Sequence, residues 1–119
     1  MMNTCTLYGI PNCDQVKKAR DWLAGHQLPY AFHDFKKQGI SADLVGTWLA
    51  EVGLDTLLNR RGTTWRSLPP ERKAAVTDAA SAIPLLLEFP SLIKRPVLSV
   101  GGRTHVGFAD ARYQQIFQS

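Results

Sequence analysis

The spacing of apolar residues divides this chain into three parts, and the first part predicts a βαβ unit. A short run of β-branched, aromatic and apolar residues at Thr4–Tyr8 predicts a strand that ends at Gly9. Apolar residues then recur at helical spacing over 13–24, and alternation returns over 29–35. A strand, a helix and a strand connected in this way are typical of a parallel βαβ unit.

The middle of the chain has helical patterns and no strand pattern. Ser41 and Gly53 bracket one predicted helix. Pro84 is expected in the first turn of another helix that reaches about Phe89, because proline is tolerated there. Shorter helices are predicted at 63–66, 70–73 and the alanine-rich stretch 74–82.

Strand character returns in the last part of the chain. The run Pro96–Val100, the pair Gly101-Gly102 and the run Arg103–Val106 predict an antiparallel hairpin. Asp110 then begins a last helix. The pattern therefore indicates an α/β protein, a single domain over residues 1–119, with βαβ and ββα parts separated by a helical block.

Composition and charge narrow the class of function. With 119 residues, 45% hydrophobic and 20% charged, the chain is long enough for one compact domain. No apolar run approaches a membrane span, and the first residues lack the features of a secretory signal, so we expect a cytoplasmic protein without membrane contact. The net charge of +4 is spread along the chain, which favours a small anion as substrate over direct nucleic-acid binding.

Cys13 is the residue best placed for chemistry. It follows a strand and a Gly-Ile-Pro-Asn turn, and it precedes or begins a helix. Unpaired backbone N–H groups and the helix dipole stabilise a thiolate at such a position. The alternative is that Cys13 is a small apolar residue at a helix start.

The second cysteine, Cys5, lies in the predicted first strand, too far along extended chain to reach Cys13. No CxxC motif and no pair of Cys or His at metal-ligand spacing is present, so no metal site and no bound cofactor are predicted. A reactive Cys13 would therefore act as a monothiol whose disulfide is resolved by an external thiol, such as glutathione or a glutaredoxin-like donor.

Three arginines are weighed for binding an oxyanion or carboxylate, because a guanidinium binds both in a fixed fork geometry. Arg61 lies in LLNRRGTTWR with Arg60 beside it, and Arg95 immediately precedes Pro96, which stiffens the entry to a strand. Of these, Arg61 and Arg95 are the predicted anion-binding residues. The alternative for each is a solvated surface charge. That simpler interpretation is adopted for Arg66, Arg72, Arg103 and Arg112, and the three scattered histidines are taken as surface or strand residues.

Four segments in this order resemble the ArsC/Spx/YffB family of thioredoxin-like proteins, closest to its YffB branch: TLYGIPNCDQVKKARDWL, LLNRRGTTWR, LIKRPVL and VGFADARYQQIF. The resemblance implies a thioredoxin-like core at about 1–38 and 90–119, with a helical insertion at about 39–89. It implies that Cys13 is the reactive cysteine and that Arg61 and Arg95 bind anions. It also places Asn12 next to that cysteine and implies a cis peptide bond at Pro96.

The sequence departs from the arsenate reductases at one position. Where these enzymes carry a third arginine, this chain has Gly107. One fewer cation would leave a charged adduct less stabilised by about 2–4 kcal/mol in a site without water.

Three functions follow from these observations. The leading hypothesis is a glutathione-dependent monothiol reductase that acts on a small oxidised thiol or an oxyanion. The second is arsenate reduction with glutathione or glutaredoxin. The third is a binding protein that contacts RNA polymerase, as in the Spx branch, without enzymatic activity.

Overall fold

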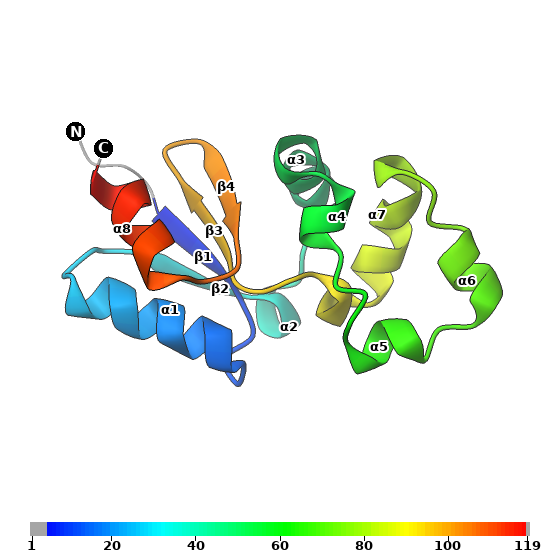
Figure 1. The fold of residues 1–119 in the computed structure, drawn as a ribbon, viewed down its shortest axis with the longest axis horizontal. Helices are drawn as coiled ribbons and strands as arrows, with labels where there is room; N and C mark the ends of the chain where they lie inside the picture. The colour runs from blue at the N-terminus through cyan, green and yellow to red at the C-terminus, as the bar shows by residue number, and fades with distance from the viewer. Residues whose placement is uncertain (1–4, 119) are drawn as a thin grey trace. The chain divides into compact units, whose positions relative to one another are not determined.

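The computed structural model describes residues 5–118, which divide into two compact units. One unit combines the described residues up to Lys37 with those from Arg95 onward, and the other is Gln38–Lys94 (Figure 1). The sequence places the second boundary near residue 89. The structure places it later because Asn59 N–H donates to Leu92 O (2.7 Å), which ties the segment before Arg95 to the helical unit.

The sheet unit contains all four strands and three helices. The elements are β1 (Cys5–Gly9), α1 (Asp14–Gly25), β2 (Ala31–Asp34), α2 (Phe35–Gln38), β3 (Val97–Val100), β4 (Arg103–Val106) and α8 (Asp110–Gln118). The last residue of α2, Gln38, lies at the start of the other unit. Thr4, the predicted first residue of the first strand, lies outside the described residues.

The strands are arranged in the order β2-β1-β3-β4. β1 pairs with β2 in parallel and with β3 in antiparallel, and β3 pairs with β4 in antiparallel. Gly101 and Gly102 have φ of 59° and 76°, as a tight two-residue hairpin turn requires. The predicted βαβ unit, the hairpin and the thioredoxin-like α/β fold are therefore confirmed.

Helices α1 and α8 pack against the same face of the sheet. Leu7 of β1 is paired with Leu98 of β3, and both are fully buried. Tyr113 of α8 is also fully buried in their cluster. The other buried members are Cys5, Ala19, Trp22, Leu23 and Val100. This packing fixes the direction in which α1 leaves the sheet.

The helical unit is built around α3 and α7, which pack together. Its elements are α3 (Ala42–Val52), α4 (Leu54–Leu57), α5 (Thr63–Arg66), α6 (Pro70–Ala74), α7 (Ala79–Glu88) and the 3₁₀ helix η1 (Pro90–Leu92). The Ser41 hydroxyl accepts from Leu44 N–H and caps α3, and Gly53 has a φ of 86° at its end. Each helix contributes fully buried side chains to this unit, such as Trp48 of α3 and Leu86 of α7.

Three local predictions are wrong. The predicted helix over 74–82 is interrupted, because Asp78 and Ser81 form a capping box that starts α7 at Ala79. Pro84 consequently lies inside α7 rather than in its first turn. The predicted strand over 29–35 ends at Asp34, whose carboxylate accepts from Lys36 N–H (2.8 Å) and begins α2.

Within residues 5–118, no helix is both long enough and apolar enough to cross a membrane.

Candidate active site around Cys13

A close contact between β1 and α1 positions the loop that carries Cys13. A Cβ atom on Gly9, the last residue of β1, would lie 2.7 Å from Cγ2 of the fully buried Val16. Only glycine therefore allows the strand to end this close to the helix. Cys13 N–H donates to Ile10 O (3.3 Å), and Cys13 O accepts from Lys17 N–H (2.9 Å). The chain thus turns tightly and makes Cys13 the N-cap residue of α1.

The environment of the Cys13 sulfur favours the thiolate. Partial burial alone would raise the pKa of this thiol. The N–H group of Val16, the guanidinium of Arg95 and the N–H group of Gln15 outweigh burial, and the pKa of Cys13 is lowered below its ordinary value. The side chain does not cap α1 through a hydrogen bond of regular geometry, so these groups act mainly by stabilising negative charge on the sulfur.

Arg95 reaches this site from the segment that enters β3. The Arg95–Pro96 peptide bond is cis, as the resemblance implied. Pro96 is buried, and its carbonyl oxygen accepts from Gly107 N–H (2.8 Å), which fixes the segment against the chain that follows β4. Arg95 itself is partly buried. The structure therefore brings together Cys13, Arg95 and Pro96, three of the five residues predicted from the sequence.

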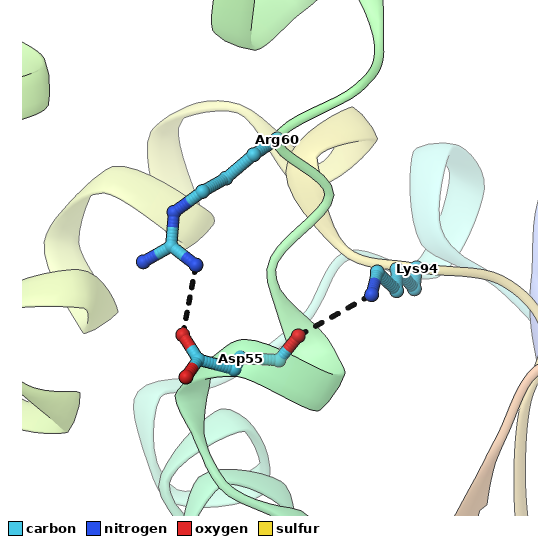
Figure 2. Close-up of polar contacts among 3 residues, drawn as sticks. All are labelled: Asp55, Arg60 and Lys94. Atoms are coloured by element: carbon cyan, nitrogen blue, oxygen red, sulfur yellow. Dashed lines mark hydrogen bonds and ion pairs between the residues drawn. The ribbon is translucent and has the colours of Figure 1, made fainter.

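Arg61 belongs to the helical unit, in a loop shaped by Asn59. Arg61 N–H donates to Asn59 Oδ1 (3.0 Å), which makes a side-chain turn. The neighbouring Arg60 is already engaged, because its guanidinium pairs with the Asp55 carboxylate at 2.8 Å (Figure 2). The Asp55 carbonyl oxygen accepts from Lys94 Nζ (3.3 Å) in the same view. By contrast, the exposed Arg61 guanidinium makes no ion pair with any residue of 5–118.

The remaining predicted residue, Asn12, is exposed in the turn before Cys13. The other cysteine is far from this loop along the sheet. Cys5 begins β1, is buried and pairs in register with Val100, whereas Cys13 follows the other end of the same strand. Both thiols are free.

A model of the ArsC family matches residues 8–116. The chain belongs to the ArsC family. Among solved structures, a protein named YFFB is 52% identical, with a TM-score of 0.90 over 94% of this chain and 97% of that chain. An arsenate reductase (ArsC) related protein from Brucella melitensis is 47% identical, with a TM-score of 0.74 over 98% of this chain and 96% of the other.

A further relative bears a different kind of name. The global transcriptional regulator Spx of Listeria innocua is 29% identical over 105 residues, which are 87% of this chain and 79% of the regulator. This ArsC-family protein is thus similar both to proteins named for arsenate reduction and to proteins named for transcriptional regulation.

Sequence reasoning anticipated some of the groups that shape this ArsC-family site and missed others. It predicted that backbone N–H groups at the helix start would stabilise the thiolate, and the structure identifies them as those of Gln15 and Val16. The sequence indicated Arg95 only as an anion-binding residue, whereas in the structure its guanidinium also lowers the pKa of Cys13. Only the position of Gly9, at the end of a predicted strand, could have indicated the close approach of Val16. Chemically, the site can hold a nucleophilic thiolate beside a cation.

Proposed function

We propose that this ArsC-family protein is a glutathione-dependent monothiol oxidoreductase with Cys13 as its nucleophile. The observation that supports the proposal most strongly is the stabilised thiolate at the start of α1, beside the Arg95 guanidinium. A second cysteine that could resolve a disulfide within the chain is not within reach, since Cys5 is buried at the far end of β1. An external thiol is therefore needed to complete turnover.

The reaction proceeds in two thiol–disulfide exchanges. The Cys13 thiolate attacks the glutathione sulfur of a mixed disulfide between substrate and glutathione. A Cys13–glutathione bond forms as the substrate sulfur leaves as a thiolate and takes up a proton. A second glutathione thiolate then attacks the glutathione sulfur on Cys13, which releases the Cys13 thiolate and forms glutathione disulfide. The substrate sulfur is reduced, and two glutathione sulfurs end as a disulfide.

Arg95 would stabilise the Cys13 thiolate and the developing negative charge of a leaving group. Arg61 would bind a carboxylate of glutathione or an oxyanion.

The role of Arg61 can be tested against its neighbour Arg60. Arg61→Ala and Arg60→Ala remove the same charge one residue apart, but Arg60 is paired with Asp55. We expect Arg61→Ala to raise the KM for glutathione about tenfold, the effect of losing one hydrogen bond to a charged group. Arg60→Ala should leave the KM nearly unchanged.

The deciding experiment is glutathione-coupled reduction of the mixed disulfide of glutathione and 2-mercaptoethanol. Cys13→Ser should reduce the rate to the uncatalysed background, while Cys5→Ala should retain most of it. Mass spectrometry of the Cys5→Ala variant during turnover should show one bound glutathione on Cys13. Turnover that survives in Cys13→Ser would overturn the mechanism.

Arsenate reduction is the second candidate, favoured by the similarity to the arsenate reductase related protein from Brucella melitensis. The Cys13 thiolate would displace water from arsenate to form a sulfur–arsenic(V) bond. Glutathione would then attack the Cys13 sulfur, so that two electrons pass to arsenic and arsenite leaves. A second glutathione, or a glutaredoxin, would release Cys13 from the resulting mixed disulfide. Arsenate-dependent oxidation of glutathione, suppressed in Arg95→Ala, is the test.

The backbone at Gly107 bears on this second candidate. Gly107 has a φ of 84°, and the surrounding space is open, since no heavy atom lies within 4 Å of a Cβ placed there. An arginine at this position would adopt a left-handed conformation at a cost of about 1–2 kcal/mol. An arginine would therefore be strained at this position, and because the site lacks that third cation we rank arsenate reduction below thiol reduction.

A regulatory protein is the third candidate, favoured by the relatives named as global transcriptional regulator Spx. It predicts direct binding to RNA polymerase that Cys13→Ser does not change. Binding to purified polymerase without any glutathione-dependent turnover would favour this candidate over both reductases.

A further inference from the structure

A cavity lined by basic residues lies in the sheet unit between the β3–β4 hairpin and α8. Its volume is about 550 Å³, within the range of small-molecule sites in proteins. Seven of the described residues line it: Val100, Gly101, Arg103, His105, Arg112, Gln115 and Ile116.

Cations from two different elements converge on this cavity. Arg103 comes from β4 and Arg112 from α8, and among residues 5–118 no acidic residue lines the cavity. One guanidinium nitrogen of Arg112 donates to Val106 O (3.0 Å), which anchors the side chain at the cavity wall. Within residues 5–118, the exposed Arg103 guanidinium makes no ion pair or side-chain hydrogen bond. In the part of the chain that the structure describes, these two positive charges therefore have no acidic partner in the cavity.

The cavity is separate from the Cys13 site. Val100 and Arg103 pair at the hairpin end of the sheet, where Val100 also pairs with Cys5 at the start of β1. Cys13 follows the opposite end of β1. A strand of five residues, about 13 Å between its end Cα atoms, separates the two places.

We propose that this cavity binds a small organic phosphate. Two guanidinium groups match the double charge of a phosphate monoester, and a guanidinium binds phosphate oxygens in a two-pronged geometry. The side chains of Val100 and Ile116 provide an apolar surface for the organic part of the ligand. Gln115 adds an amide that can donate to or accept from that part. The ligand class is therefore a phosphate monoester with a planar or apolar body, such as a nucleoside monophosphate.

The test is a titration of the ¹⁵N-labelled full chain with adenosine 5′-monophosphate, followed by amide chemical shifts. Shifts should cluster on β4 and α8 and give a Kd below about 1 mM. Arg103→Ala should weaken binding at least about fivefold, since it removes one charged hydrogen-bond donor. Arg66→Ala, which removes the same charge from an exposed position of the helical unit, is the matched control and should not change the Kd. Cys13→Ser should also bind normally, which separates this site from the proposed enzymatic function.

Separate titrations distinguish the parts of the ligand. Adenosine should not bind, and inorganic phosphate should bind at least about tenfold more weakly than the monophosphate. Equal affinity for inorganic phosphate would overturn the assignment to an organic phosphate. The absence of shifts on β4 and α8, or equal losses in Arg103→Ala and Arg66→Ala, would overturn the site itself.

Discussion

The two ends of strand β1 carry the two cysteines of this protein, and the same thiol group has opposite properties at each end. Cys5 begins the strand, is only 7% exposed, and burial raises its pKa. Cys13 follows the strand and is also partly buried, yet its pKa is lowered. The difference arises from what faces each sulfur, because Cys13 has backbone N–H groups and a guanidinium where Cys5 has apolar neighbours.

The surroundings of Cys5 strengthen this contrast. Tyr113 is fully buried in the same cluster, and its hydroxyl has no hydrogen-bond partner among the described residues. Burial, together with the nearby Cys5, raises the pKa of Tyr113. This end of the sheet therefore disfavours negative charge on either group, whereas the start of α1 favours it. Whether a cysteine of this protein favours the thiolate form therefore depends on the surroundings of its sulfur atom.

Alkylation should show the largest difference between the two thiols. In the native protein at pH 7, iodoacetamide should modify Cys13 faster than Cys5 by on the order of 10³, because Cys5 reacts only after the core opens. The rates are measured by mass spectrometry of Cys5→Ala and Cys13→Ser, which each leave one thiol. Adding denaturant should make the two rates similar, and similar rates without denaturant would contradict the comparison.

The contact between Gly9 and Val16 should have the next largest effect, since it connects the strand to the start of α1. Gly9→Ala places a methyl group 2.7 Å from Val16 Cγ2 and should lower the free energy of unfolding by about 1–3 kcal/mol. Gly25→Ala is the matched control, because a Cβ there meets nothing within 4 Å, and it should be neutral or stabilising. Denaturant unfolding measures both variants.

A second substitution identifies the cause of that loss. Val16→Ala in the Gly9→Ala background removes the Cγ2 methyl group that clashes, so the double variant should lose less stability than the sum of the two single changes. Purely additive losses would show that the backbone of Gly9, and not its contact with Val16, is what matters.

The sheet unit could be predicted in advance because its signals are local. Alternating residues mark its strands, and Gly101-Gly102 can adopt the positive φ values that the hairpin turn needs. The helical unit is harder to predict, because nothing in the alanine-rich stretch 74–82 strongly marks where one helix ends and the next begins. The break before α7 depends on the hydrogen bonds between Asp78 and Ser81, and those form only when the chain turns at that point.

The candidate functional residues also divide into those with a local sequence signal and those without one. Cys13 could be chosen from its place after a strand, and Arg95 from its place before Pro96 and from the family resemblance. The cavity between the β3–β4 hairpin and α8 could not be predicted, because Arg103 and Arg112 lie on separate elements, and nothing in their local sequence indicates that β4 and α8 place them around one space. Two charged residues that are brought together from separate elements can be recognised only when the tertiary fold is known.

Substitution of Arg95 should reduce the difference in pKa between the two cysteine thiols. In Arg95→Ala the Cys13 thiol loses a hydrogen-bond donor and a positive charge, so its pKa should rise towards the ordinary value. The alkylation rate at pH 6.5 should fall about tenfold, the scale of one lost hydrogen bond to a charged group. Arg95→Lys keeps the charge and should recover part of the rate. Thiolate absorbance against pH, measured in a Cys5→Ala background, checks the direction.

The smallest expected effect is on stability against pH, where the two thiols should act in opposite directions. The pKa of Cys5 is raised on folding, so its contribution to stability is complete below the unfolded value of about 8.5 and is lost as the pH rises above it. The pKa of Cys13 is lowered on folding, so its contribution is complete above about 8.5 and is lost as the pH falls towards the folded pKa.

Between pH 7 and 9.5, Cys5→Ala should therefore flatten the alkaline decline in unfolding free energy, and Cys13→Ala should steepen it. Each change should be about 1 kcal/mol or less, the Cys13 effect being reduced by solvent because that thiol is partly exposed. Urea unfolding of both variants across this pH range measures the slopes, and slopes that change in the same direction would show that the two ends of β1 do not differ as the structure indicates.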